Sequence, residues 1–200
     1  MFFKKKINII LFLFLILTIC FLYLLTFERK NINSENIDSL IKSNFNLTTH
    51  LGQKVNEEYF HGNHMLVYFG FTFCPDVCPN SLTKILETVN QLPDELQTKI
   101  NVVFITVDPE RDQPVQIRSF LENFNPSIIG LTGTNEEIES VVRKYRIYVK
   151  KNKSSRDDQN YLVDHSSLFF LVDKNDKYIS HFRPDDFNSN IKSKILKKIF

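Results

Sequence analysis

The feature that most constrains this chain is a pair of cysteines placed where an apolar strand gives way to a helix. Residues 65–71 read M-L-V-Y-F-G-F, an uncharged run that predicts a strand buried on both faces. Cys74 and Cys78 follow it, and a helical pattern begins at Pro79. A helix N-terminus favours thiolate over thiol and a loop leaves sulfur accessible, so this junction suits thiol or metal chemistry.

An uncharged apolar segment near the N-terminus predicts a membrane anchor. Residues 7–27 contain no charged side chain, and about 20 apolar residues suffice to cross the hydrocarbon core as a helix. Three lysines at positions 4–6 precede the segment, so the positive-inside rule places residues 1–6 in the cytoplasm and the rest of the chain outside. A cleaved signal peptide is the alternative, but it would have a shorter apolar region and small residues at a cleavage site.

The location predicted from this segment is a bacterial inner membrane, crossed once, with the folded domain in the periplasm. A mitochondrial inner-membrane protein facing the intermembrane space is the alternative, although no Arg- and Ser-rich transit peptide precedes the segment. Cys20 lies inside the segment and follows Ile19, which is not the small residue that a lipoprotein site requires. We therefore expect no chemical role for Cys20.

The charge balance argues against a nucleic-acid-binding surface. The formal net charge is +2, and setting aside the three N-terminal lysines leaves 22 of the 25 basic residues against 23 acidic ones. Proteins that bind nucleic acids neutralise phosphates with an excess of Lys and Arg. We therefore expect no nucleic-acid partner.

Beyond the anchor, residues 28–44 are polar and predict a linker, and residues 45–200 predict one α/β domain. The pattern assigns an edge hairpin within 45–55, strands at 65–71, 101–107 and 128–131, helices at 79–92 and 113–124, a third helix through Ile138, Val141, Val142 and Tyr145, an exposed loop at 150–160, a hairpin of strands 168–172 and 178–182, and a last helix through Phe187, Ile191, Ile195 and Ile199. Asp112 is predicted to cap the second helix, and Thr134 with Glu137 to form a capping box for the third. This order predicts a thioredoxin-like fold with an N-terminal transmembrane helix, because helical crossovers connect parallel strands.

The cysteine pair alone leaves its chemistry open. At a separation of four residues, both sulfurs lie on the same side of a helical turn. They can close a disulfide if the Cα atoms are about 5–6 Å apart, or they can hold one soft metal ion. Two permanently bridged or unreactive cysteines are a weaker interpretation, because so short a loop gains little entropic stabilisation from a bridge.

His165 favours the metal. It stands just before the strand at 168–172, at or beside the place where thioredoxin-like oxidoreductases carry a cis-proline against the cysteines. Thiolates suit Cu(I) and imidazole suits copper, so the two cysteines and His165 predict a three-coordinate copper site. Asp164 is a candidate to support His165, although neighbours on a strand often point to opposite faces. Asp108 either reaches the site or only orders the Asp-Pro turn.

Three stretches together form a pattern that is far more specific than the cysteine pair. They are Y-F-G-F-T-F-C-P-D-V-C-P at 68–79, V-D-P-E-R-D at 107–112 with Pro114, and V-D-H-S at 163–166. Together they resemble the Sco/SenC family of membrane-anchored copper-binding proteins. The family usually has threonine where Gln113 stands and a lysine-containing loop in place of residues 61–64, and neither departure touches the presumed ligands.

The resemblance implies a thioredoxin-like domain that binds one copper ion through Cys74, Cys78 and His165. It also implies a metallochaperone that helps to assemble the dinuclear copper centre of cytochrome c oxidase subunit II. Its partners would then be that subunit and, through the N-terminal helix, membrane lipid.

The main alternative is a membrane-tethered thiol–disulfide oxidoreductase that reduces the target's cysteines through a mixed disulfide. In that case Cys74 and Cys78 are the catalytic residues and His165 is dispensable; whether the chain is an enzyme stays open at this point. A peroxiredoxin-like peroxidase is a weaker hypothesis, since Thr72 is two residues before Cys74 and not three. Structural zinc normally has four protein ligands, which this pattern does not supply.

Overall fold

The computed structural model describes residues 13–24, 41, 43–124, 127–152, 161–188 and 191–199. The chain divides into two compact units, Met1–Leu40 and Ile41–Phe200. In the first unit residues 13–24 form a helix, and most of its apolar side chains are exposed. Across the described part of the chain, no helix combines the length and the hydropathy of a membrane span. Residues 1–12 and 25–40, which include both ends of the predicted anchor and most of the predicted linker, lie outside the described residues.

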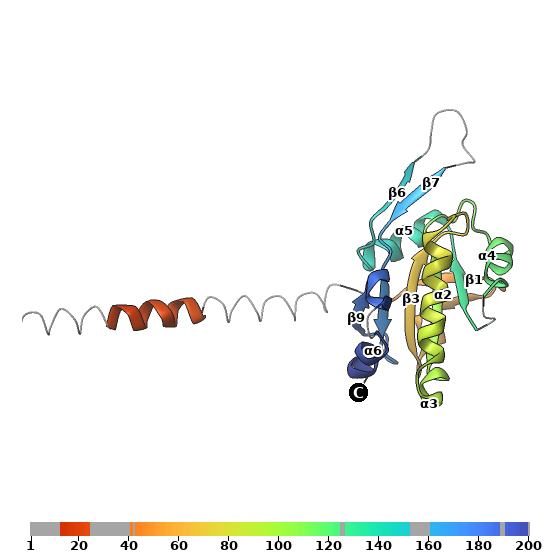
Figure 1. Cartoon of the computed structure of the whole chain (residues 1–200). Helices are drawn as coiled ribbons and strands as arrows, with labels where there is room; N and C mark the ends of the chain where they lie inside the picture. Colours follow the sequence, from red (N-terminus) through yellow and green to blue (C-terminus); the bar gives the residue numbers. More distant parts are fainter. Residues whose placement is uncertain are drawn as a thin grey trace, which may run out of the picture. The chain divides into compact units, whose positions relative to one another are not determined.

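The second unit confirms the predicted alternation of strands and helices (Figure 1). Its described strands form a seven-stranded sheet in the order β2-β1-β5-β4-β3-β8-β9 and a separate pair, β6 and β7. In chain order the elements are β1 (Asn46–Thr49), β2 (Lys54–Asn56), β3 (His64–Gly70), α2 (Val77–Asn90), α3 (Asp94–Gln97), β4 (Ile100–Thr106), α4 (Pro114–Leu121), β5 (Ile129–Thr132), α5 (Asn135–Lys144), β6 (Val149–Asn152), β7 (Leu162–His165), β8 (Phe169–Val172), β9 (Tyr178–Phe182) and α6 (Ile191–Ile199), with 3-10 helices at Glu57–Phe60 and Pro184–Asn188.

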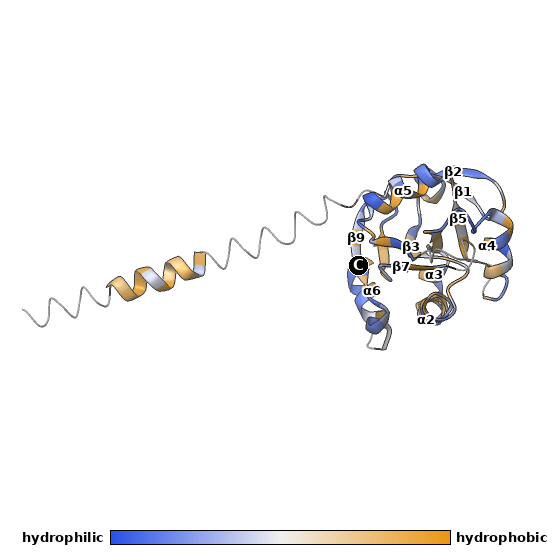
Figure 2. Ribbon diagram, turned by 90° about the horizontal axis from the view of Figure 1, so that it is seen from above, coloured by the Kyte–Doolittle hydropathy of each residue, from blue (hydrophilic) through white to orange (hydrophobic). Residues whose placement is uncertain are grey.

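Strand β3 is the centre of the domain. It pairs in parallel with β4 over its whole length and antiparallel with β8, and every residue from Met65 to Gly70 is buried. Helices α2 and α6 lie on one face of the sheet and α5 on the other (Figure 2), which explains why an uncharged run is needed here. At the end of the strand, a Cβ on Gly70 would come within 2.9 Å of the Phe104 ring and 3.1 Å of the Cys78 sulfur. Helix α2 therefore packs its cysteine directly against the backbone of the central strand.

The sequence predictions for the loop at 150–160 and for the last helix need correction. The prediction of a loop at 150–160 is wrong for residues 150–152, which belong to β6. Strand β6 pairs with β7 in a register that places Val149 opposite His165. Residues 153–160 lie outside the described residues. Figure 1 shows this hairpin projecting from the body of the domain. The last helix begins at Ile191, and Phe187 lies in the preceding 3-10 helix. The capping box of Thr134 and Glu137 is confirmed.

Asp112 is a buried hydrogen-bond acceptor, and its prediction as the N-cap of α4 is wrong. Gln113 occupies the N-cap position. The Asp112 carboxylate accepts from the Thr72 backbone N–H at 2.9 Å and from the hydroxyls of Thr72 and Thr106, both at 2.6 Å. These bonds attach the loop that carries the cysteines to the end of β4. Burial raises the pKa of the Asp112 carboxyl, against the effect of its hydrogen bonds.

Asp112→Ala leaves three donors without their acceptor, so we expect it to lower the free energy of unfolding by about 2–5 kcal/mol. Asp112→Asn keeps one acceptor and the volume, and we expect a cost of about 1 kcal/mol or less. Because the folded pKa of Asp112 is raised above 3.8, the wild type loses stability relative to the Asn variant as pH rises from 3.8 through that folded pKa. Urea unfolding at several pH values measures both effects. Asp94→Ala, at an exposed helix start, is the control, and an equal cost for the two alanine variants would contradict the buried-acceptor role.

Candidate metal centre

The two cysteines bracket the start of α2. Cys78 is the second residue of the helix and is fully buried, whereas Cys74 lies in the preceding loop and is partly exposed. The Cys78 backbone N–H donates to the Cys74 sulfur at 3.4 Å, and the Cys74 N–H donates to the Phe71 carbonyl at 3.2 Å. No disulfide joins the two sulfurs. The loop thus presents one accessible thiol and holds the other beneath it.

The two thiols have opposite acidities. A hydrogen bond from the Cys78 side chain, helped by backbone N–H groups at Asp76 and Cys78 and opposed by partial burial, lowers the pKa of Cys74 to about 5. The same hydrogen bond, together with burial, raises the pKa of Cys78. At neutral pH the pair therefore holds one thiolate, on Cys74, and one thiol, on Cys78. The expectation that the helix N-terminus favours a thiolate does not hold for Cys78, and the low pKa of Cys74 has the hydrogen bond from Cys78 as its main cause.

His165 meets the buried cysteine from the other side. It is the last residue of β7, and its Nε2 lies 3.5 Å from the Cys78 sulfur. Its Nδ1 lies 3.3 Å from the Ser166 carbonyl, and a carbonyl only accepts, so Nδ1 donates and the Nε2 lone pair faces the cysteines. Burial lowers the pKa of His165. The imidazole is therefore neutral at neutral pH, which is the form that binds metals.

The spacing of Cys78 and His165 fits a shared metal ion. Two ligands that each lie about 2.0–2.3 Å from one ion, the distances found for zinc, are separated by roughly 3.5 Å, which is the observed distance between the Cys78 sulfur and His165 Nε2. Within the described ranges, no three His, Cys, Asp or Glu side chains converge closely enough to hold an ion together. The structure thus brings two of the three predicted ligands to ligand spacing, and it places the Cys74 sulfur against the Cys78 backbone.

The two aspartates left open by the sequence have different surroundings. Asp164 points away from the site, and its carboxylate accepts from the Asn152 side chain at 2.7 Å. Asp108 is fully buried and pairs with Arg111 Nε at 2.5 Å and with Lys151 Nζ at 3.2 Å. The Tyr161 hydroxyl donates to the same carboxylate at 2.6 Å. Asp108 therefore does more than order the Asp-Pro turn.

Sequence reasoning missed the role of Arg111, Tyr161 and Lys151 in this cluster. Arg111 belongs to the V-D-P-E-R-D stretch and Tyr161 directly precedes β7, so both stood in or next to motifs that were already singled out. The signal that could have found them is a buried acidic residue at a strand end, which requires basic partners. Lys151 and Tyr161 lie more than 40 residues after Asp108, and this separation concealed the contact between Asp108 and the β6–β7 hairpin.

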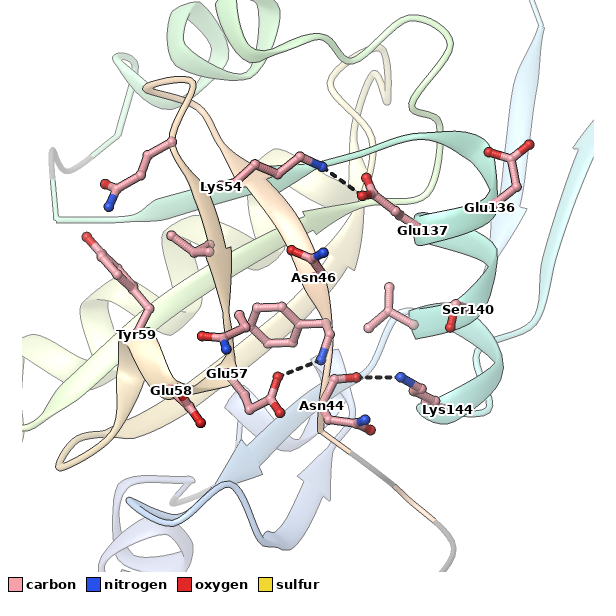
Figure 3. A pocket seen from close by; sticks show the side chains of 15 residues that line it. Asn44, Asn46, Lys54, Glu57, Glu58, Tyr59, Glu136, Glu137, Ser140 and Lys144 are labelled. Atoms are coloured by element: carbon pink, nitrogen blue, oxygen red, sulfur yellow. Dashed lines mark hydrogen bonds and ion pairs between the residues drawn. The ribbon is translucent and has the colours of Figure 1, made fainter.

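A separate hollow of about 1050 Å³ lies between the β1–β2 hairpin and α5 and does not include the cysteines. Figure 3 shows three pairs among its polar groups. Lys54 bonds Glu137 at 2.7 Å, the Phe45 N–H donates to Glu57 at 3.0 Å, and Lys144 donates to the Asn44 carbonyl at 2.9 Å. This hollow is therefore lined by groups other than the two cysteines and His165.

The fold and the site define a thioredoxin-like domain that carries two unequal thiols and a neutral imidazole at one end of its central strand. The chain matches the family model SCO1/SenC over residues 33–199. It belongs to the SCO1/SenC family, as the sequence motifs predicted.

Relatives match over most of the chain. A "SCO2-like protein" of Rickettsia felis is 39% identical over 191 residues, which cover 91% of this chain and 92% of the relative. The structure of Bradyrhizobium japonicum ScoI with copper bound is 34% identical, with a TM-score of 0.70, and the match covers 80% of this chain and 99% of ScoI. BsSco, described as a member of the Sco family of cytochrome c oxidase assembly proteins with a disulfide switch, is 27% identical, with a TM-score of 0.58, over 76% of this chain and 92% of BsSco.

The unequal thiols predict a characteristic pH profile of alkylation. In a reduced Cys20→Ser background, we expect the rate of iodoacetamide labelling at Cys74 to rise with pH and to be half-maximal near pH 5, well below the value of about 8.5 for an ordinary cysteine. Cys78 should stay unlabelled. Cys78→Ala removes the hydrogen bond to Cys74, so the midpoint should move up. Mass spectrometry of quenched samples measures the rates, and a wild-type midpoint near 8.5 would contradict the shared hydrogen bond.

Proposed function

We propose that this protein is a copper metallochaperone that binds one copper ion through Cys74, Cys78 and His165. The observation that carries the proposal is the contact between the Cys78 sulfur and the neutral His165 imidazole, beside a thiolate at Cys74. Two thiolates and one imidazole are a soft ligand set that suits Cu(I). The copper-bound ScoI structure, which shares the fold over 80% of this chain, supports the assignment.

The same geometry suits release as well as binding. Three ligands leave room for a fourth, and Cys74 and His165 are partly exposed while Cys78 is buried. A thiolate of a partner can therefore approach from the side of Cys74 and take over the ion one ligand at a time. Closing all three ligands on the ion requires the Cys74 sulfur to turn from the Cys78 backbone toward His165.

The proposed client is cytochrome c oxidase subunit II, whose dinuclear copper centre would receive the ion. Membership of the SCO1/SenC family and the likeness to BsSco, a Sco family cytochrome c oxidase assembly protein, support this client. We also propose that residues 7–27 anchor the protein in the bacterial inner membrane, with residues 1–6 in the cytoplasm, 28–44 as linker and 45–200 in the periplasm. The absence of charge from residues 7–27 and the lysines before them support this arrangement.

A second candidate function is reduction of a target disulfide, and the low pKa of Cys74 favours it. The Cys74 thiolate would attack the target disulfide and form a mixed disulfide, while one target sulfur leaves as a thiolate. Cys78 would then give up its proton and attack Cys74, which releases the second target sulfur and leaves a Cys74–Cys78 disulfide. The target gains two electrons and this protein loses two. The same pair could thus prepare the client's cysteines before copper arrives.

Copper titration tests the metallochaperone. We expect the reduced full-length chain in detergent to bind one equivalent of Cu(I) tightly in competition with a chromophoric chelator. His165→Ala should raise the dissociation constant at least about tenfold, equivalent to ~1.4 kcal/mol, and Cys74→Ser with Cys78→Ser should abolish tight binding. His61→Ala, at the opposite end of β3, is the control and should leave the affinity unchanged.

The outcome separates the two functions. Binding that ignores His165, together with ready reduction of a model disulfide by the His165→Ala variant, would overturn the copper site and leave a thiol reductase. If His165→Ala and the double cysteine variant both lose copper binding, and reduction of the model disulfide is slow, the metallochaperone is the function that remains.

The anchor has its own test. We expect the full chain to stay with the membranes after an alkaline carbonate wash, because burying about 20 apolar residues in lipid is effectively irreversible. Removal of residues 1–27 should release the domain into the soluble fraction, whereas replacing Lys4, Lys5 and Lys6 by Gln should keep it in the membrane and disturb only its orientation. Full release of the intact chain by carbonate would rule out a spanning anchor.

A further inference from the structure

The two parts of the candidate site come from strands that do not pair with each other directly. The cysteines follow β3 in the main sheet, whereas His165 ends β7, which pairs only with β6 among the described strands. After His165 the chain is fixed, because β8 pairs with β3 from Phe169 onward. At its base the hairpin is held by backbone bonds, from the Ser166 N–H to the Tyr148 carbonyl and from the Ile147 N–H to the Val142 carbonyl of α5. On its loop side, side chains at Lys151 and Tyr161 contact Asp108 at the end of β4. Contacts that fix the start of β7, at Tyr161, therefore restrain the strand that ends in His165 and help to set where the imidazole stands relative to the thiols.

Arg111 makes that contact. Its guanidinium carbon lies 3.7 Å from the centre of the Tyr161 ring and 4.7 Å from the centre of the Phe73 ring, with the Phe71 ring at 5.9 Å. Phe73 adjoins Cys74 in the cysteine loop, and Tyr161 directly precedes β7. One planar cation is thus stacked with an aromatic ring from each half of the site. Cation–π contacts of this kind contribute most when the cation is shielded from water, and the Arg111 side chain is only 13% exposed.

Asp108 fixes the orientation of this guanidinium. Its fully buried carboxylate accepts from Arg111 Nε at 2.5 Å and from the Tyr161 hydroxyl at 2.6 Å. The Nζ of Lys151 in β6 lies 3.2 Å from the same carboxylate and 3.0 Å from the carboxylate of Glu110. The carboxylate therefore lies at the end of β4 and binds the hairpin on its loop side, at Lys151 of β6 and at Tyr161 before β7. Arg111 cannot swing away from Tyr161 without leaving a buried negative charge short of a partner.

We propose that Arg111 is a positioning residue for the metal centre, which clamps the cysteine loop at Phe73 onto the histidine hairpin at Tyr161. The inference rests on the proposed copper site and deepens it, because it names what holds His165 at ligand distance before the ion arrives. A preorganised hairpin leaves less ordering for the ion to impose, which strengthens binding.

Arginine is required at this position for a physical reason. The guanidinium is flat, so it can stack between two rings while its edge donates to Asp108, whereas a lysine ammonium supplies charge without a stacking plane. Arg111→Lys therefore keeps the charge beside Asp108 and removes the clamp. Phe73→Leu removes the other half of the stack at a side chain that is 54% exposed, so this second variant carries little risk to folding.

The experiment measures copper affinity and hairpin protection on the reduced full-length chain in detergent. We expect Arg111→Lys and Phe73→Leu each to raise the Cu(I) dissociation constant about tenfold, as changes behind metal ligands commonly do. Without copper, the amides of β6 and β7 should exchange with deuterium about tenfold faster in both variants, and the amides of β4 should not change. Arg143→Lys, an arginine that is 70% exposed and pairs with Glu139, is the matched control and should resemble the wild type.

A double-mutant cycle separates positioning from general stability. If Arg111 acts by placing His165, adding Arg111→Lys to His165→Ala should weaken copper binding no further. Additive losses in that cycle, or faster exchange throughout β4, would overturn the positioning role. Wild-type affinity and hairpin exchange in both Arg111→Lys and Phe73→Leu would overturn it as well. Equal copper affinity of the wild type and His165→Ala would overturn the proposed function instead. The hydrogen-exchange data without copper would still test whether Arg111 fixes the hairpin.

Discussion

The pairing of β3 with its two neighbours determines where every part of the candidate site stands. Its parallel pairing with β4 sets the loop that carries Cys74 beside the loop that carries Asp108 and Asp112. Its antiparallel pairing with β8 brings His165 back to the same end of the sheet. Both faces of β3 are buried, so a register slip of one residue would exchange the side chains of its two faces and disrupt the packing on each. The position of the candidate site therefore depends on the register of β3.

Several parts of this arrangement follow from the sequence because their signals are local. The uncharged run at 65–71, the capping box at Thr134 and the apolar periodicity of the helices each predict one element, and the order of elements then predicts the fold. The cysteines were located because the spacing of Cys74 and Cys78 at a strand–helix junction is itself a local pattern. His165 needed one further step, namely its position just before the strand at 168–172, and the contact of its Nε2 with Cys78 agrees with that expectation.

Other parts could not be predicted because they depend on partners that are remote in the sequence. The strands of the β6–β7 hairpin read V-K-K-N and L-V-D-H, which lack the β-branched and aromatic density that marks a strand. The two strands are held by the backbone hydrogen bonds between them and by the bonds of Tyr161 and Lys151 to Asp108. Asp112 illustrates the same limit, since an aspartate before a helix predicts a cap and nothing nearby indicates that Thr72 and Thr106 will surround it.

The two candidate functions share one pair of sulfurs, and their electron balance makes them exclusive at any moment. A Cys74–Cys78 disulfide would remove two of the three proposed copper ligands and leave His165 alone, which cannot hold Cu(I) tightly. A bound copper ion in turn occupies the Cys74 thiolate that disulfide exchange requires. The protein can therefore reduce a client and then deliver copper only if a separate thiol donor returns its own pair to the reduced state between the two steps. The unequal thiols suit this order, because the exposed Cys74 thiolate is the group that meets either a disulfide or a partner's sulfur first.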